Sequence, residues 1–221
     1  VLEIIKKEEG VTRIAAASIM LSKQGPIFLS DATINIDPSA ADLANIALLT
    51  AKAVKFFGLE PSVAMLSYSN FGSATSESTL KVREAVAYLH KHYPDLVVDG
   101  EIQADFALNP DKIAKTYPFS KLNNGKGANA LIFPNLEAAN ISYKLLKETQ
   151  HLDTIGPVIM GLTKPIHIMI LSTNAANLSR SKFKKEIEKG FAGRKHRYLA
   201  EYGLPADFVY NKKDGSSNYL K

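Results

Sequence analysis

Short apolar runs alternate with amphipathic stretches through residues 27–171, and this alternation constrains the fold more than any other feature of the sequence. Strands that alternate with helices favour right-handed crossovers and a mostly parallel sheet that is covered on both faces. The sequence therefore predicts an α/β fold with three layers, αβα. The runs that suit buried strands are IFLSD (27–31), SVAMLSY (62–68), LVVDGEIQ (96–103), ALIFP (130–134), IGPVIMG (155–161) and PIHIMIL (165–171).

Three stretches between these runs have apolar residues at helical spacing. In the first, Asp37 is expected to cap the helix, Pro38 suits its first turn and Gly58 suits its end. The predicted core-facing stripes are Leu43, Ile46, Ala47, Val54 and Phe57 in the first helix, Val82, Ala85, Val86 and Leu89 in the second, and Leu136, Ala139, Tyr143 and Leu146 in the third.

Composition excludes several classes of function. The chain has no Cys, which rules out disulfides and thiolate chemistry, and no apolar run approaches the roughly 20 residues that span a bilayer. The amino terminus, VLEIIKKEEG, is too charged for a signal peptide, so we expect a cytoplasmic protein without membrane contact. The five His residues are scattered and predict no metal site, and GxSxG, GxGxxG and GxxxxGKS are absent.

The positive charge is concentrated at the carboxyl end of the chain. Residues 174–221 hold 11 basic and 5 acidic residues, whereas the remaining body holds 16 and 17. Nucleic-acid binding favours a basic face on the folded body, so we expect no nucleic-acid partner. We expect one domain over residues 1–171 and a basic tail over 172–221.

Polar residues gather where the predicted strands end, in SDATIN (30–35), SYSNFGS (67–73), DGEIQAD (99–105), PNLEAAN (134–140) and GLTKP (161–165). Ligands of open α/β sheets bind beyond the carboxyl ends of the strands. The sequence therefore predicts a polar ligand cleft there. The candidate ligand-binding residues are Ser67, Tyr68, Ser69, Asn70, Gly72, Ser73, Arg83, Asn135, Asn140 and Lys164.

Two groups of charged residues near these strand ends have alternative roles. Arg83 either contacts a phosphate or pairs with a carboxylate in the neighbourhood of Glu84. Asp99 and Glu101 suit acid–base chemistry or Mg²⁺ binding, but such carboxylates more often order loop backbone, and this is the interpretation we favour.

The segments GPIFLSDATINIDPSA, EPSVAMLSYSNFGS, VDGEIQADFALN, ANALIFPNLEAANISYKLL and IGPVIMGLTKPIH, in this order, resemble the phosphate acetyl/butyryl transferase family. The resemblance runs from about residue 13 to 168 and implies the second lobe of an isocitrate-dehydrogenase-like, phosphotransacetylase-like fold. The SNFGS and KPIHIM segments resemble most the carboxyl-terminal transferase-like domain of large bacterial NADP-dependent malic enzymes.

The sequence departs from active transferases at three places. Those enzymes carry a Ser-Arg pair shortly after the KPI segment, where this chain has Met169 and Ile170. Arg180 follows too late to replace that Arg. The first lobe, which supplies the other wall of the cleft, would lie upstream, and the family's closing apolar helix does not resemble the basic tail.

The resemblance leaves two functions open. The first is a regulatory domain that binds acetyl-CoA without catalysing transfer, has no catalytic residues of its own and contributes to a homo-oligomer. NADP and Mg or Mn would then belong to an upstream malic enzyme domain that oxidatively decarboxylates malate. The alternative is an active phosphate acetyltransferase that converts acetyl-CoA and phosphate to acetyl phosphate and CoA. In both cases the partner is a small-molecule acyl-CoA. A purely structural assembly domain is a third, weaker possibility.

Overall fold

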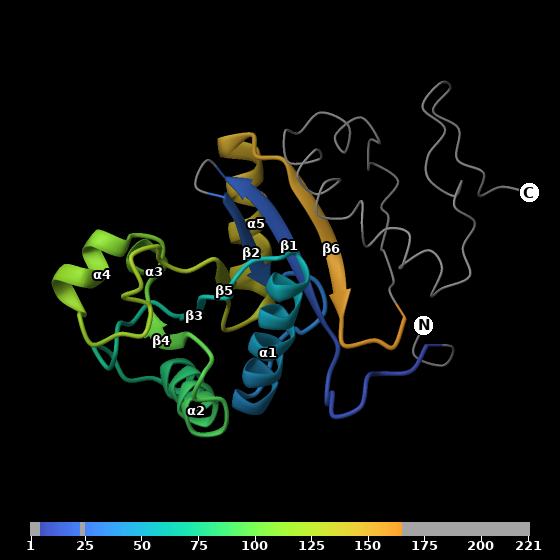
Figure 1. The fold of residues 1–221 in the computed structure, drawn as a ribbon, viewed down its shortest axis with the longest axis horizontal. Coiled ribbons are helices and arrows are strands. Elements are labelled where there is room, and N and C mark those ends of the chain that lie inside the picture. The colour runs from blue at the N-terminus through green and yellow to red at the C-terminus, as the bar shows by residue number, and fades with distance from the viewer. Residues whose placement is uncertain (1–4, 23–24, 165–221) are drawn as a thin grey trace, which may run out of the picture. The chain divides into compact units, whose positions relative to one another are not determined.

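The computed structural model describes residues 5–22 and 25–164, which form an α/β domain (Figure 1). The predicted strand PIHIMIL, the basic tail, the boundary at residue 171 and Arg180 all lie outside these residues. The strands are β1 (Ala15–Ser22), β2 (Gly25–Ser30), β3 (Val63–Leu66), β4 (Val98–Ile102), β5 (Ala130–Ile132) and β6 (Thr154–Met160). The helices are α1 (Ala40–Phe56), α2 (Glu77–His92), α3 (Ala104–Ala107), α4 (Pro110–Thr116) and α5 (Leu136–Gln150).

The strands of the described residues form one sheet in the order β4-β3-β5-β2-β1-β6. Strands β4, β3, β5 and β2 are mutually parallel, and β1 is antiparallel to both β2 and β6. Because β6 reverses the direction of β1, it points the same way as β2. The mostly parallel sheet predicted from the sequence is therefore confirmed, with β1 as its reversed strand.

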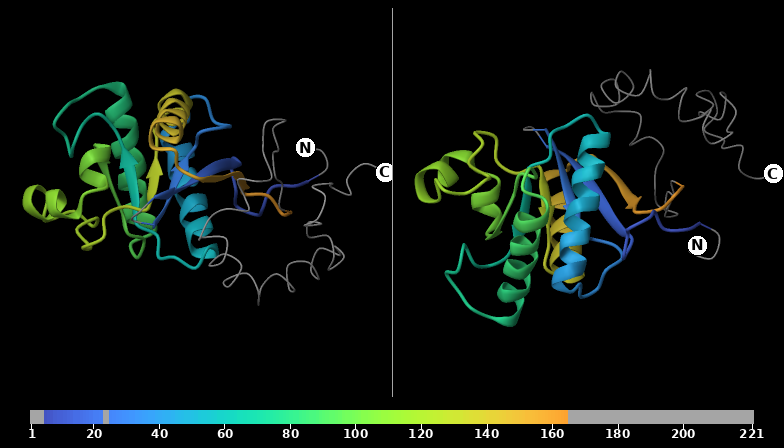
Figure 2. Two further views of the ribbon diagram at one scale, coloured as in Figure 1. Left: turned by 90° about the horizontal axis from the view of Figure 1, so that it is seen from above. Right: turned by 60° about the horizontal axis from the view of Figure 1, so that its bottom comes forward.

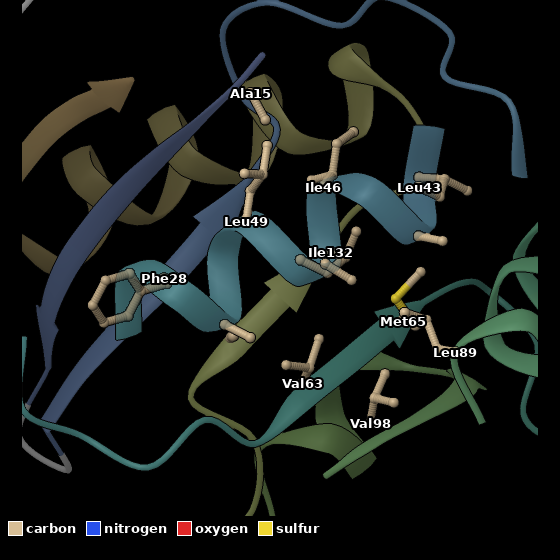
Figure 3. Packing of buried hydrophobic residues seen from close by; sticks show 14 of the residues in the cluster. Ala15, Phe28, Leu43, Ile46, Leu49, Val63, Met65, Leu89, Val98 and Ile132 are labelled. Carbon is tan, nitrogen blue, oxygen red and sulfur yellow. The ribbon is translucent and has the colours of Figure 1, made fainter. Parts of the chain in front are cut away.

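Apolar side chains cover both faces of the sheet and give the three predicted layers. On one face α1 and α2, which run side by side in Figure 2, pack onto the strands through residues such as Leu43 and Leu89. Figure 3 shows this core, where Leu43 and Ile46 of α1 lie near Met65 and Ile132 of the sheet. The opposite face carries a second cluster that includes residues of α3, α4 and α5.

Strand β1 is absent from the sequence prediction. Its first residues are three alanines, which have a weak preference for strands, so the segment does not read as one. The strand forms because β2 and β6 pair with it on both sides and bury Ala15, Ala16 and Ala17 completely. Neighbouring strands thus override the local preference.

The predicted cap of the first helix is wrong by two residues. Ser39 is the N-cap of α1: its hydroxyl accepts a hydrogen bond from Asp42 N, and the Asp42 carboxylate accepts one from Ser39 N. This reciprocal pair satisfies two backbone donors that the start of the helix leaves free. Asp37 instead pairs with Lys81 at 2.6 Å, and Pro38 precedes the cap.

The apolar stripes of the first two helices are largely buried as predicted, but that of α5 is not. Of the α5 residues, Ala139 is fully buried, whereas Leu146 is 39% exposed. The neighbouring Ile141 and Leu145 are still more exposed. Helical spacing marked an apolar side of α5 without showing how much of it the sheet covers.

Gly100 lies in β4 where its pairing with β3 shifts register between Met65 and Leu66. Its φ is +148°, and a Cβ added there would lie 2.5 Å from the carbonyl oxygen of Met65. This position requires Gly because a side chain has no room and the backbone conformation disfavours L residues. Gly100 therefore allows the strand that carries Asp99 and Glu101 to approach β3.

We expect Gly100→Ala to lower the free energy of unfolding by more than about 2 kcal/mol, because backbone crowding adds to the cost of the unusual φ. The matched control is Gly58→Ala, since Gly58 has φ +78° but nothing within 4 Å of an added Cβ. Urea denaturation of both variants measures the difference. Equal losses would show that the approach to Met65 is not tight.

Candidate functional site

The five predicted polar segments, of which the last is described for residues 161–164, follow strands that point the same way, so they lie along one edge of the sheet, which we call the carboxyl rim. Two pairs of loops are joined directly. The loops after β3 and β4 meet where Gln103 N donates to Asn70 Oδ1 at 2.8 Å. Those after β2 and β5 meet where Leu136 N donates to Ile36 O at 2.9 Å. The sequence-based grouping of these loops at one rim is therefore correct.

The loop after β3, residues 67–76, is held from inside by the fully buried carboxylate of Glu101 in β4. Its Oε1 accepts hydrogen bonds from Ser69 Oγ at 2.7 Å and from Gly72 N at 2.8 Å. The Arg83 guanidinium of α2 donates to both carboxylate oxygens, with Nε 2.9 Å from Oε2 and Nη2 3.1 Å from Oε1. One carboxylate thus connects β4, the loop and α2.

The serines of SYSNFGS serve mainly to order the loop itself. Ser69 is fully buried and donates its hydroxyl proton to Glu101, so the 3.1 Å contact between its Oγ and that of Ser73 requires Ser73 to donate. The Ser73 hydroxyl also accepts from Asn70 N at 2.9 Å, and that of Ser69 accepts from Ala74 N at 3.0 Å. The small polar residues therefore replace a regular hydrogen-bond ladder in a tight turn.

Charge at Glu101 is stabilised despite burial. Burial alone would raise the pKa of Glu101, but hydrogen bonds from Arg83, Gly72 and Ser69 outweigh it and hold the pKa below its ordinary range. The hydrogen bond to Glu101 also raises the pKa of Arg83. A general acid at neutral pH needs a raised pKa, so the geometry favours the role of Glu101 in ordering the loop over acid–base chemistry.

Arg83 pairs with Glu101, which is a different carboxylate from those near Glu84 that the sequence suggested. Its Nη2 also donates to Ala74 O, so the guanidinium fastens both the loop and β4. The described residues contain one other arginine, Arg13, which pairs with Asp42 at 3.2 Å. Both guanidinium groups therefore already face carboxylates.

The remaining candidates lie farther along the rim. Asn135 caps α5 by accepting from Ala138 N at 2.9 Å, and Asn140 donates to Ala32 O at 3.0 Å. Lys164 follows β6 and is exposed. Three strands separate β3 from β6, which at the usual spacing is roughly 19 Å, so the structure does not bring Lys164 to the loop of residues 67–76.

Two residues whose side chains order the loops, Asp31 and Gln103, were not among the candidates predicted from the sequence. The buried Asp31 carboxylate accepts from Thr33 N, Ile34 N and Ala16 N and so orders the loop after β2. Gln103 joins two loops through Asn70 and through Tyr68 O, to which its Nε2 donates at 2.6 Å. A polar residue directly after an apolar run was the available signal in both cases.

A cavity of about 500 Å³ lies at the opposite edge of the sheet, where its walls include Lys55 of α1 and Tyr93 after α2. None of the candidate residues lines it.

Within residues 5–22 and 25–164, no cluster of three or more His, Asp or Glu residues is suited to a metal ion. The same part of the chain has no helix with the length and apolar character that crossing a bilayer requires.

Replacing the buried carboxylate tests this arrangement. We expect Glu101→Gln to lower the free energy of unfolding at pH 7 by about 1–3 kcal/mol, because hydrogen-bond donors in the interior lose a charged acceptor. Since the folded pKa of Glu101 is lowered, its stabilisation is complete above the unfolded value near 4.3 and is lost as pH falls through the folded pKa. The deficit of the variant should shrink accordingly in urea titrations from pH 7 to 3.

The control is Asp37→Asn. Asp37 forms a 2.6 Å ion pair with Lys81, and its side chain is 78% exposed. The substitution should change the free energy of unfolding by less than about 0.5 kcal/mol. A Glu101→Gln deficit that matches this control, or that stays constant across the pH range, would contradict the proposed ordering role.

Known proteins with similar sequences include malic enzymes and phosphate acetyltransferases. The chain is 40% identical to the NADP-dependent malic enzyme of Haemophilus influenzae over 167 residues, which is 76% of this chain and 22% of that enzyme. It is 39% identical to the phosphate acetyltransferase of Bacillus subtilis over 177 residues, or 80% of this chain and 54% of that protein. The chain thus spans about a fifth of the first relative and about half of the second.

Structure and family comparisons agree with these sequence matches. The EutD phosphotransacetylase from Staphylococcus aureus superposes with a TM-score of 0.73 and 35% identity, covering 80% of this chain and 54% of that one. The sequence profile of the phosphate acetyl/butaryl transferase family matches residues 1–180. The chain therefore belongs to the phosphate acetyl/butaryl transferase family.

Proposed function

We propose that this domain binds acetyl-CoA at the carboxyl rim and acts as a regulatory part of an NADP-dependent malic enzyme, without catalysing acyl transfer. The polar loops that meet at the rim support the binding site, since such edges are where open α/β sheets take ligands. Ser67, Tyr68, Asn70, Gly72 and Ser73 are the proposed contacts, with Ser69 and Arg83 holding the loop in place.

The observation that carries the regulatory assignment is the engagement of both described arginines. Transfer to phosphate needs a cationic donor for the phosphate oxygens, for which the planar guanidinium is well suited. Arg83 is held by the buried Glu101 carboxylate, and Arg13, whose side chain is 56% exposed, pairs with Asp42 through Nε. Where active relatives are expected to have Ser-Arg, the sequence has Met169 and Ile170, which lie outside the described residues.

In this proposal, the oxidative decarboxylation of malate with NADP and Mg or Mn is carried out by another domain of a longer protein. The malic enzyme of H. influenzae is long enough to include such a part, because this chain matches 22% of it. We propose that the domain also contributes to a homo-oligomer. An in-frame malate- and NADP-binding domain encoded upstream would support this assignment.

An active phosphate acetyltransferase is the second candidate. The 39% identity to the B. subtilis phosphate acetyltransferase and the TM-score of 0.73 to EutD phosphotransacetylase favour it. In that reaction phosphate attacks the acetyl carbon of acetyl-CoA, the C–S bond breaks, and acetyl phosphate and CoA leave. The hydrogen-bond donors for the phosphate would have to be other residues, or the N–H groups of Arg13 and Arg83 that do not contact their carboxylates.

Two measurements on the purified protein separate these functions. We expect calorimetry to detect acetyl-CoA binding, and an assay with acetyl-CoA and phosphate to yield no acetyl phosphate and no free CoA. Turnover would reject the regulatory assignment in favour of the transferase. Absence of both binding and turnover would reject both functions.

Two variants, each of which replaces an exposed Tyr by Glu, locate the binding site. Tyr68→Glu places a negative charge on the rim at a side chain that is 60% exposed, and should weaken acetyl-CoA binding about tenfold by repelling its phosphates. Tyr93→Glu makes the same change at a 41% exposed Tyr beside the opposite-edge cavity, and should leave the affinity unchanged. The reverse result would move the site to that cavity.

A further inference from the structure

Four aromatic residues, Phe71, Phe106, Tyr117 and Phe119, form a cluster at the β4 end of the carboxyl rim, which we call the aromatic ledge. The Tyr117 ring lies 4.9 Å from that of Phe71, 5.2 Å from Phe106 and 6.0 Å from Phe119, measured between centroids. Phe71 and Phe119 meet edge to face at 5.1 Å. The ledge joins the loop after β3 to the segments on either side of α4.

Support for the ledge comes from within the fold. Phe71 and Phe106 pack against the apolar cluster on one face of the sheet. Phe71 has φ +45°, an unusual conformation for a residue with a bulky side chain, and its N–H donates to Glu101 O at 2.8 Å. An unusual backbone conformation held by its surroundings often marks a functional position.

Phe119 lies on this support with 70% of its surface exposed. Its aromatic neighbours restrict its orientation, so the exposed ring is a pre-positioned apolar surface. Lys112 and Lys115 of α4, the helix that precedes Tyr117, are both exposed, whereas Lys121 is turned away and donates its Nζ to Pro94 O before β4. Lys112 pairs with Asp105 and lies over the Phe106 ring at 5.4 Å. The ledge therefore combines an exposed aromatic ring with positive charge beside a polar rim.

The geometry points to a base-stacking subsite: the purine of the bound acyl-CoA stacks on Phe119, and the phosphates of its nucleotide half lie near Lys112 and Lys115 of α4. This inference rests on the proposed acyl-CoA binding at the rim. Stacking on an aromatic side chain recognises a base through its flat face, and the lysines match the charge of the phosphates. The acyl end would then extend along the rim towards the loops after β5 and β2.

Calorimetry with three Phe119 variants tests the subsite. Phe119→Ala should weaken acetyl-CoA binding about five- to 150-fold, which is the range of aromatic base stacking. Phe119→Leu should lose affinity similarly because it is apolar but not aromatic, whereas Phe119→Trp should retain it. Ile141→Ala, which shortens a 63% exposed apolar side chain of α5, is the matched surface control and should have no effect. Thermal unfolding checks that each variant is folded.

Fragments of the ligand distinguish failure of this inference from failure of the proposed function. Adenosine 3′,5′-bisphosphate should bind the wild-type protein and lose affinity in Phe119→Ala, whereas acetyl-phosphopantetheine should bind both proteins equally. If acetyl-CoA binds the wild type and Phe119→Ala alike, the subsite is rejected and the proposed function stands. If acetyl-CoA does not bind the wild type, both are rejected.

Discussion

The carboxylate of Glu101 is the interaction on which the candidate site depends. It is buried in the strand next to β3, yet its charge is retained because Ser69, Gly72 and Arg83 all donate to it. Gly100 makes this possible, since its lack of a Cβ lets β4 approach Met65 and so brings Glu101 under the loop. The conformation of the loop and the position of Arg83 depend on this carboxylate, and the main-chain oxygen of the same residue accepts a hydrogen bond from Phe71 N.

The same interaction explains why a polar rim need not be a catalytic one. A guanidinium that holds a buried carboxylate through Nε and Nη2 keeps its Nη1 donors for other partners, but it cannot move to follow a transferring phosphate unless the pair separates, and separation would leave a charge in the interior. The structure thus uses Arg83 to order the loop after β3. A ligand can still be recognised there through exposed loop atoms and the neighbouring aromatic ring, which require no mobile charge.

Much of this arrangement was predictable from the sequence. The alternation of apolar runs and helical stripes predicted the sheet, its two covered faces and the common edge of the polar loops, because strand direction follows from crossover connections. Strand β1 was missed because its alanines have little strand preference and its place depends on β2 and β6. The cap at Ser39 was missed because Asp37 offered an equally good local signal.

Within the site, the residue types were predicted better than their partners. The loop 67–73 was recognised by its serines, but the sequence does not show that Ser69 turns inwards to Glu101 or that Arg83 reaches Glu101, 18 residues away. These contacts arise from the register of β3 and β4. The same limit applies to Lys164, whose distance from the loop follows from strand order.

Chemical-shift mapping of acetyl-CoA on the ¹⁵N-labelled protein shows whether the ligand binds at the ordered rim. The largest shifts are expected at the amides of residues 67–76 and 103, with smaller ones at 31–36 and 117–121. Shifts confined to residues around the opposite-edge cavity, such as Lys55 and Tyr93, would contradict binding at the rim.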